Sequence, residues 1–120
     1  MHIDKDLVAA SATSLVLGIL GEGESYGYAI LRRVEDLSQG RMQWTDGMLY
    51  PLLHRLERLG YVSASWGTSE EGRRRKHYAI TPAGRDALAQ RRQQWYVVAD
   101  ALDQIWRGTL PPTRTAEGWA

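Results

Sequence analysis

The chain contains no cysteine, and this absence excludes a disulfide scaffold, a thiolate metal site and a cysteine nucleophile. Long apolar runs are also missing, because the run from Leu15 to Leu20 is far below the roughly 18 residues that a membrane span requires. The first residues, Met1 to Asp6, lack the basic start of a signal peptide. We therefore expect a protein of the cytoplasm, a reducing compartment, with no membrane partner.

Catalytic motifs are scarce as well. The histidines His2, His54 and His77 lie in separate segments, and the sequence contains neither an H-E-x-x-H nor a G-x-S-x-G string. The glycine-rich residues 21–27 resemble a dinucleotide fingerprint, but the third glycine comes one place late and no strand is expected before it. We expect neither an enzyme nor a cofactor. A metal-responsive protein that uses His2, Asp4 or His77 stays open as an alternative, although no ligand spacing favours it.

A large excess of charge of one sign is absent too, since the net charge is only +1. The charge is unevenly distributed, because residues 73–92 hold many cations and only one acid, Asp86. Such a run can be a solvated loop, but in a hairpin that follows an amphipathic helix it favours phosphate contact. The candidate phosphate-binding residues are the consecutive cations Arg73, Arg74, Arg75 and Lys76.

Residues 45–60 have the periodicity of an amphipathic helix, with Thr45 as the expected N-cap and Gly60 as the expected C-cap. The leucines recur at helical spacing and predict a stripe that faces the core: Leu49, Leu52, Leu53, Leu56 and Leu59. The opposite face holds the side chains that could enter a groove of DNA: Gly47, Tyr50, Pro51, His54 and Arg58, with Arg55 at the edge.

Two short strands are predicted after this helix, at residues 61–66 and 75–80, because apolar and polar side chains alternate there. Tyr78 and Ile80 share one face of the second strand. The intervening residues 67–73 are polar and rich in turn formers, so the pair should form a hairpin with a solvated tip. A hairpin of this kind can lie along a phosphate backbone.

Three further helices are expected, at residues 7–20, at 25–40 with Ser25 as the cap, and from Thr81 to about residue 106. The first is apolar on nearly all sides, and we expect that a single small domain cannot cover it. The end of the last helix carries an apolar stripe with no remaining partner in the chain. A second copy should therefore cover an interface that includes Leu7, Leu15, Trp95, Leu102, Ile105 and Trp106.

Four strings, read in order, resemble the PadR-like family of transcriptional regulators, in its short form with a single C-terminal helix. They are Tyr26-Gly27-Tyr28, the helix string Gly47 to Glu57, the hairpin string Gly72 to Tyr78, and Ile80-Thr81-Pro82-Ala83-Gly84. Met48 departs from the family, which usually has a small hydroxyl residue there. The resemblance implies a mainly α fold with a small β-hairpin: a winged helix-turn-helix over residues 1–80 and a dimerisation helix over 81–108. Residues 109–120 lie outside the resemblance and, with two prolines, are expected to form a disordered tail.

The resemblance also implies a regulator, acting as a repressor, that binds an inverted-repeat operator in double-stranded DNA as a homodimer. A protein-interaction module that uses the apolar last helix without DNA stays open as an alternative, and a salt titration of DNA binding would separate the two. Phosphates would be contacted by Tyr26, Thr45, Tyr50, Arg73, Arg74, Arg75 and Lys76, and bases would be read by Gly47, Pro51, His54 and Arg55.

Trp95 has two interpretations. A tryptophan on a helical stripe is usually core, and here it would pack in the dimer interface against Val98 and Ala99. Alternatively, two copies of Trp95 face each other across the dimer axis and hold a planar aromatic ligand, with Val98 and Ala99 lining the slot. The resemblance supports the second interpretation, because some relatives with a tryptophan in this helix bind planar aromatic compounds at the dimer centre and release DNA.

Overall fold

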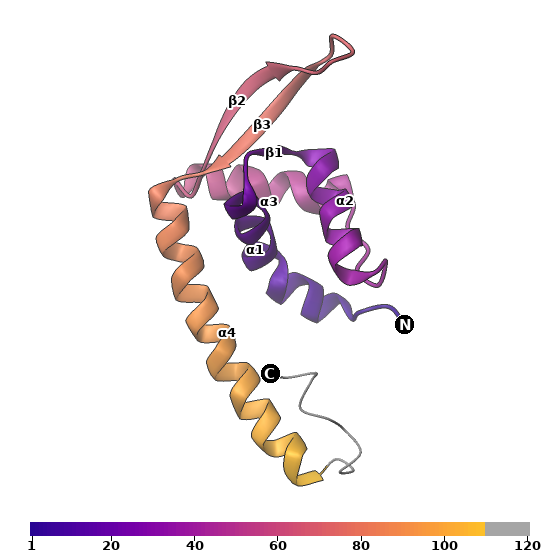
Figure 1. Ribbon diagram of the computed structural model, residues 1–120, viewed down its shortest axis with the longest axis vertical. Coiled ribbons are helices and arrows are strands. Elements are labelled where there is room, and N and C mark those ends of the chain that lie inside the picture. Colours follow the sequence, from indigo (N-terminus) through magenta and orange to yellow (C-terminus); the bar gives the residue numbers. More distant parts are fainter. Residues whose placement is uncertain (110–120) are drawn as a thin grey trace. The chain divides into compact units, whose positions relative to one another are not determined.

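The computed structural model describes residues 1–109 of the chain, so the expected tail lies outside the described residues apart from Thr109. The fold is mainly helical with a small antiparallel sheet, as predicted (Figure 1). No helix in residues 1–109 is long and apolar enough to cross a membrane. The elements in chain order are α1 (Lys5–Glu22), β1 (Ser25–Tyr26), α2 (Gly27–Ser38), α3 (Asp46–Arg58), β2 (Val62–Thr68), β3 (Arg74–Ile80) and α4 (Pro82–Thr109).

The chain divides into two compact units, and the second begins at Ala89. The boundary was expected after residue 80, shortly before α4 begins at Pro82. The first unit nevertheless extends to Leu88, because Ala87 and Leu88 in the first two turns of α4 pack against the core. These turns belong with the helices and the sheet that precede them in the chain.

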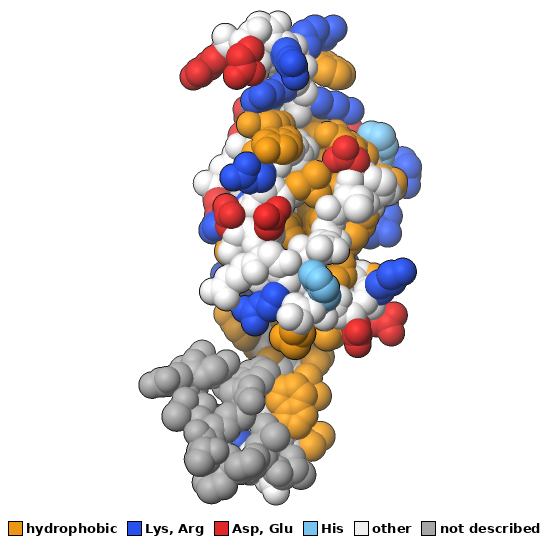
Figure 2. Space-filling model, turned by 90° about the vertical axis from the view of Figure 1, so that its right-hand side faces the viewer, with side chains coloured by type: hydrophobic (Ala, Val, Ile, Leu, Met, Phe, Trp, Pro, Cys, Tyr) orange, Lys and Arg blue, Asp and Glu red, His pale blue; other side chains and the backbone are white. Residues whose placement is uncertain are grey.

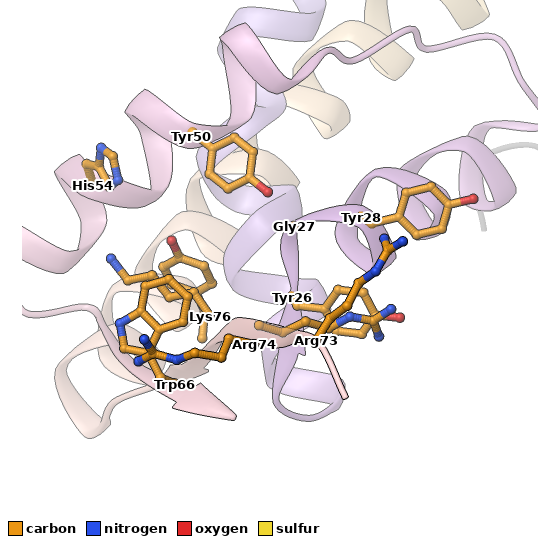
Figure 3. Close-up of a pocket in the computed structure, with 11 residues that line it drawn as sticks. Tyr26, Gly27, Tyr28, Tyr50, His54, Trp66, Arg73, Arg74 and Lys76 are labelled. Atoms are coloured by element: carbon orange, nitrogen blue, oxygen red, sulfur yellow. The ribbon is translucent and has the colours of Figure 1, made fainter. Parts of the chain in front are cut away.

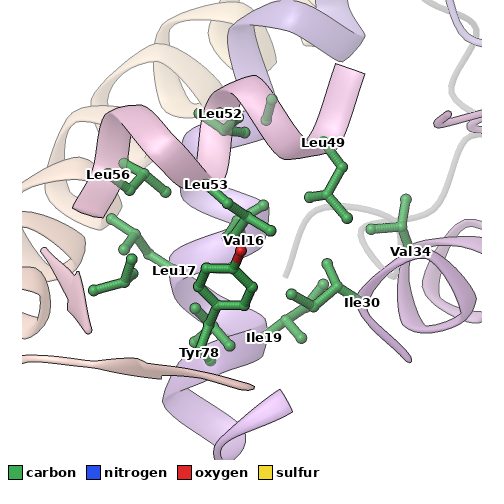
Figure 4. Close-up of a cluster of buried hydrophobic side chains, with 13 residues drawn as sticks. Val16, Leu17, Ile19, Ile30, Val34, Leu49, Leu52, Leu53, Leu56 and Tyr78 are labelled. Atoms are coloured by element: carbon green, nitrogen blue, oxygen red, sulfur yellow. The ribbon is translucent and has the colours of Figure 1, made fainter. Parts of the chain in front are cut away.

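The core of the first unit lies between α1, α2, α3 and β3 (Figure 4). The predicted leucine stripe of α3 is confirmed at four positions, where Leu49, Leu52, Leu53 and Leu56 are buried. Residues from the other elements complete the core, and those with almost no exposed surface are Val16, Leu17, Leu20, Ile30, Val34 and Tyr78.

Leu59, the fifth leucine of the predicted stripe, is 55% exposed, so its assignment to the core was wrong. The helix ends at Arg58, and Gly60 adopts a φ of 80°, which turns the chain away from the stripe. The Tyr61 N–H donates to the Leu56 carbonyl at 2.9 Å, and the Gly60 N–H donates to the Glu57 carbonyl at 3.0 Å. These two bonds form a Schellman motif in which Gly60 is the residue after the cap.

Helix α1 is covered by its own chain to a greater extent than the sequence suggested. Along its length Val8, Ala12, Val16, Leu17, Ile19 and Leu20 are all buried, because α2, α3 and the sheet surround this helix. Of the two α1 residues that were assigned to the dimer interface, Leu15 is half-buried and Leu7 is 57% exposed. The expectation that a single small domain cannot cover α1 was therefore wrong for these six residues, while Leu7 and part of Leu15 stay exposed.

The short strand β1 was not predicted. Ser25 was expected to cap α2, but Ser25 and Tyr26 pair with Tyr78 and His77 of β3, and Tyr26 precedes the helix without a side-chain cap bond. The sheet has the order β1-β3-β2. A strand of two residues has no periodicity to detect, and its hydrogen bonds depend on a partner more than 50 residues away in sequence, as the pairing of Ser25 with Tyr78 shows.

The start of α4 is fastened to the end of α3 by Thr81. Its Oγ1 accepts from the Gly84 N–H at 3.1 Å and donates to the Gly60 carbonyl at 2.6 Å, while its N–H donates to the Tyr61 carbonyl at 3.0 Å. This confirms Thr81 as the cap with Pro82 at the first helical position. A β-carbon at Gly84 would overlap the Tyr61 carbonyl, so only glycine permits this close approach.

Candidate nucleic-acid interface

Helix α3 exposes the face that the sequence assigned to DNA. Thr45 is its N-cap, and Thr45 Oγ1 accepts from the Met48 N–H at 3.3 Å, as predicted. The buried leucines fix the rotation of the helix about its axis. The residues left at the surface include Gly47, Tyr50, Pro51, His54 and Arg58.

A cavity of about 670 Å³ lies between α3, the start of α2 and the hairpin of β2 and β3 (Figure 3). It brings together seven of the predicted DNA-binding residues: Tyr26, Tyr50, His54, Arg73, Arg74, Arg75 and Lys76. Four residues that were not predicted complete the lining, namely Gly27, Tyr28, Trp66 and Tyr78. None of these lining residues carries a carboxylate, so the cavity combines aromatic rings with cations.

The consecutive cations of the hairpin divide between its two faces. In a strand, neighbouring side chains point to opposite faces, and the pairing of Trp66 with Lys76 places Arg74, Lys76 and Trp66 on the same face of the hairpin. Arg75 shares the other face with His77 and with Tyr26 of β1. Figure 3 shows Arg74 beside Trp66, and Arg73 on the side of Tyr26 and Tyr28.

On the first of these faces, each cation lies over an aromatic ring. The Arg74 guanidinium carbon lies 4.7 Å from the centroid of the Trp66 ring, and Lys76 Nζ lies 5.6 Å from that of Tyr78. Lys76 Nζ is also 3.8 Å from Glu57 Oε1 of α3, so this lysine links the hairpin to the end of α3. Burial, followed by the carboxylate of Glu57, raises the pKa of Tyr78 above its usual value, so its ring stays neutral beneath Lys76.

On the second face, Arg75 lies over the Tyr26 ring at 4.3 Å, and its Nη2 is 3.8 Å from Glu71 Oε2. His77 packs against Tyr26 with ring centroids 5.7 Å apart, and its Nδ1 is 3.4 Å from Glu24 Oε1. Tyr26 is therefore held between a cation and an imidazole. These contacts tie β1 and the start of α2 to the hairpin.

Gly27 allows Tyr50 to pack closely against the start of α2. A β-carbon at Gly27 would overlap the Tyr50 phenol, beginning with its oxygen. Tyr50 keeps 38% of its surface exposed while its ring is confined by this contact. Its hydroxyl is thus presented from a defined position at the cavity.

Several predicted residues lie outside the cavity lining. Thr45, Gly47 and Pro51 are exposed at the start of α3, and Arg55 lies toward α1. Arg55 Nη2 donates to Thr13 Oγ1 of α1 at 3.3 Å, so this arginine also supplies the partner of a buried hydroxyl. The structure therefore separates Arg55 from the group formed by Tyr50 and His54.

Charged side chains at the hairpin end of the molecule are mostly basic, with acidic side chains near its outer tip (Figure 2). The acids of the tip, Glu70 and Glu71, lie in the turn between β2 and β3. Within residues 1–109 no three histidine, aspartate or glutamate side chains lie close enough to hold a metal ion. The metal-responsive alternative has no supporting observation in that part of the chain.

Trp66 lines the cavity but was not among the predicted DNA-binding residues. The hairpin register places it on the same strand face as Val62 and Ala64, yet it is 61% exposed. The reason is that β2 continues to Thr68, beyond the reach of the core. The signal available in the sequence was Arg74, because the hairpin register places this cation on the same face as Trp66.

The comparisons with known proteins show the family of the chain. Residues 16–90 match the Transcriptional regulator PadR-like family, a span that reaches from the middle of α1 into α4. Transcriptional regulator Rv3488 of Mycobacterium tuberculosis (strain ATCC 25618 / H37Rv) is 42% identical over 76 residues, which cover 63% of this chain and 64% of that protein.

Two solved structures have the same fold over most of the chain. A transcriptional regulator from Clostridium thermocellum Cth-833 has a TM-score of 0.76 and 27% identity, covering 83% of this chain and 97% of that one. A PadR family transcription regulator from hypervirulent Clostridium difficile R20291 has a TM-score of 0.69 and 28% identity, covering 79% of this chain and 97% of that one. The chain belongs to the PadR-like family of transcriptional regulators.

Proposed function

We propose that this chain is a repressor that binds an inverted-repeat operator in double-stranded DNA as a homodimer. The observation that carries the proposal is the cavity between α3 and the hairpin, which is lined by cations and aromatic rings and by no carboxylate. Lys and Arg side chains there would neutralise phosphates, and the exposed start of α3 would lie against base edges. Because the protein must reach DNA, we place it in the cytoplasm.

The roles within the interface follow from the geometry. Tyr26, Tyr50 and the hairpin cations would contact phosphates, because they line one cavity and present hydroxyl or cationic groups. Gly47, Pro51 and His54 would read bases from the exposed face of α3, and Thr45 would lie near the backbone at its start. Arg55 fits a base-reading role less well, because it donates to Thr13.

The second half of α4 supports the dimer. Val98 and Leu102 are 49% and 38% exposed, and Tyr96 and Val97 beside them are 64% and 69% exposed. Apolar side chains reach the surface at that end of α4 (Figure 2). An apolar helix face that is left exposed in this way indicates an interaction site, and a second copy is the partner that also gives an operator its two-fold symmetry. Leu7 and Leu15 of α1, with Trp95, Ile105 and Trp106 of α4, would complete the interface.

We further propose that a planar aromatic effector binds at the dimer interface. Trp95 is 36% exposed in the single chain, and Val98 and Ala99 follow it on the same stripe. Two such surfaces facing each other would enclose a flat apolar slot, and a ligand there would change the spacing of the two recognition helices. Loss of dye binding in Trp95→Ala, together with release of DNA by the dye in wild type, is the expected result.

The proposed function is tested by electrophoretic binding to the DNA upstream of the chain's own gene, followed by a salt titration. We expect a complex with the stoichiometry of a dimer, and an affinity that falls steeply with salt because counterions are released from phosphates. Competition with random DNA should leave part of the binding in place. Absence of any DNA complex at low salt would instead favour the protein-interaction alternative.

A further inference from the structure

We propose that the Trp66–Arg74 pair is the principal contact of the hairpin with the DNA backbone, with the Trp66 indole against a deoxyribose and the Arg74 guanidinium on the adjacent phosphate. This inference rests on the proposed function and goes beyond it, because it ranks the four hairpin cations and assigns a role to a tryptophan. It follows from what each cation is bound to.

The first step is that Arg74 is held in place without being neutralised. Its guanidinium lies 4.7 Å from the Trp66 ring centroid, and both residues are exposed on the cavity face of the hairpin (Figure 3). Among the described residues no carboxylate forms an ion pair with Arg74. A guanidinium stacked on a ring keeps the N–H groups of its edge available for phosphate oxygens.

The second step is that two of the other cations are already engaged by acids. Lys76 Nζ lies 3.8 Å from Glu57 Oε1, and Arg75 Nη2 lies 3.8 Å from Glu71 Oε2. The side chains of Arg75 and Lys76 are 33% and 31% exposed, which is consistent with packing against the protein. Each would have to give up or share an ion pair to neutralise a phosphate, so both serve mainly to hold the hairpin in position.

The third step concerns Arg73, which is exposed in the turn before β3. Its backbone N–H donates to Ser69 Oγ at 3.1 Å, whereas its side chain stacks on no ring in the described residues. A long side chain that is ordered only upon binding loses conformational entropy at that moment. Arg74 has already lost much of that freedom on Trp66, so its contact costs less to form.

The remaining step is the exposed indole itself. Trp66 is 61% exposed on its face of the hairpin. The β2 residues on the opposite face are small or polar, namely Ser63, Ser65 and Gly67. A duplex keeps its bases stacked, so the apolar surface that it offers along the backbone is the deoxyribose. Placing the indole there buries apolar area and sets the neighbouring guanidinium beside the next phosphate.

The test measures the affinity of the full-length protein for a random-sequence duplex at several salt concentrations, since a backbone contact does not depend on sequence. The variants are Trp66→Ala, Trp66→Phe, Arg74→Ala, the double variant Trp66→Ala/Arg74→Ala and Lys76→Ala, and Arg33→Ala is the control because it removes one charge from α2 outside the cavity. Thermal melting of each variant confirms that it is folded.

We expect Trp66→Ala and Arg74→Ala each to weaken binding by about 10-fold, and Trp66→Phe to recover part of the loss. Arg74→Ala should lower the salt slope by about one, and Lys76→Ala should lower it clearly less. The double variant should bind the duplex only slightly less tightly than the single variant with the lower affinity, because the two residues act as a unit.

Wild-type affinity in Trp66→Ala, additive losses in the double variant, or a larger slope change for Lys76→Ala than for Arg74→Ala would each overturn the inference. Arg33→Ala should bind within about two-fold of wild type, since surface charge far from the contact is screened. If the wild-type protein itself binds no duplex, the proposed function fails rather than this ranking of residues, so the two failures are distinguishable.

Discussion

Helix α3 and the second half of α4 carry apolar stripes of the same helical spacing, yet the two stripes end up in opposite environments. In α3, Leu49 and Leu53 have no exposed surface, whereas in α4 Val98 and Leu102 are 49% and 38% exposed. Helical periodicity therefore predicts that a helix face packs against apolar surface, but it does not show whether that surface belongs to the same chain. The first stripe is buried within the chain, whereas for the second we propose a second copy of the chain as the partner.

The largest test of this contrast is Leu53→Asp. A carboxylate at this fully buried position would lie in the hydrophobic core, and the loss should exceed about 4 kcal/mol, comparable with the stability of a small domain. We expect loss of the helical circular dichroism signal of the first unit at any protein concentration. A cooperative unfolding transition like that of the wild type would show that the α3 stripe is less essential than its burial implies.

The matched substitution on the other stripe is Leu102→Asp. If a second copy covers α4, the buried carboxylate should weaken dimerisation by about 3 kcal/mol, or roughly 100-fold in Kd, while the first unit stays folded. Sedimentation at several concentrations measures this directly. Gln90→Asp, an exposed polar position on the same helix, is the control and should leave the dimer intact. A wild-type protein that sediments as a monomer would remove the basis of the contrast.

A smaller test asks how much α3 depends on its local cap rather than on its stripe. Thr45→Ala removes the bond to the Met48 N–H and should lower the free energy of unfolding by about 1 kcal/mol. Chemical denaturation gives this value, with Thr45→Ser as the control because serine restores the accepting oxygen. A loss as large as that of a core leucine would mean that the cap, not the stripe, determines the helix.

The smallest effect is expected at the strand side of the same core. Burial raises the pKa of Tyr78, so the folded state holds its proton more tightly than the unfolded state does. That contribution is present below the unfolded pKa and is lost as pH rises from about 10 through the folded pKa. Stability should therefore fall more steeply above this pH in wild type than in Tyr78→Phe. Parallel curves for the two proteins would show that Tyr78 does not titrate between the two states.

Much of the fold could be predicted because its main elements have strong local signals. The leucine spacing of α3, the Thr45 cap, the Thr81-Pro82 start of α4 and the two strands of the hairpin are all confirmed. Each of these depends on residues a few positions apart, so the information lies within one short segment.

The features that were missed depend on distant partners. Strand β1 exists because β3 accepts it, and α1 is buried mainly by elements of its own chain, which its all-round apolar character could not reveal. Leu59 shows a different limit, since the apolar spacing continues past the residue at which the backbone leaves the helix. The periodicity of apolar residues does not by itself predict the residue at which a helix ends.

The candidate site was predicted in composition but not in arrangement. The run of cations identified the hairpin, yet strand alternation divides those cations between two faces, and each face has its own aromatic partner. The contact of Tyr50 with Gly27 joins two motifs that are far apart in the sequence. Such pairings appear only when the elements are placed in space.

The Thr81 connection has a mechanical consequence. Only this residue lies between the last residue of β3 and the first of α4, and its backbone and side chain are both bonded to the turn that ends α3. The junction contains no slack loop that could absorb a rotation. A rotation of the first turn of α4 would therefore move the hairpin and the end of α3 with it. Thr81→Gly would remove the side-chain bonds at this junction and should weaken that coupling.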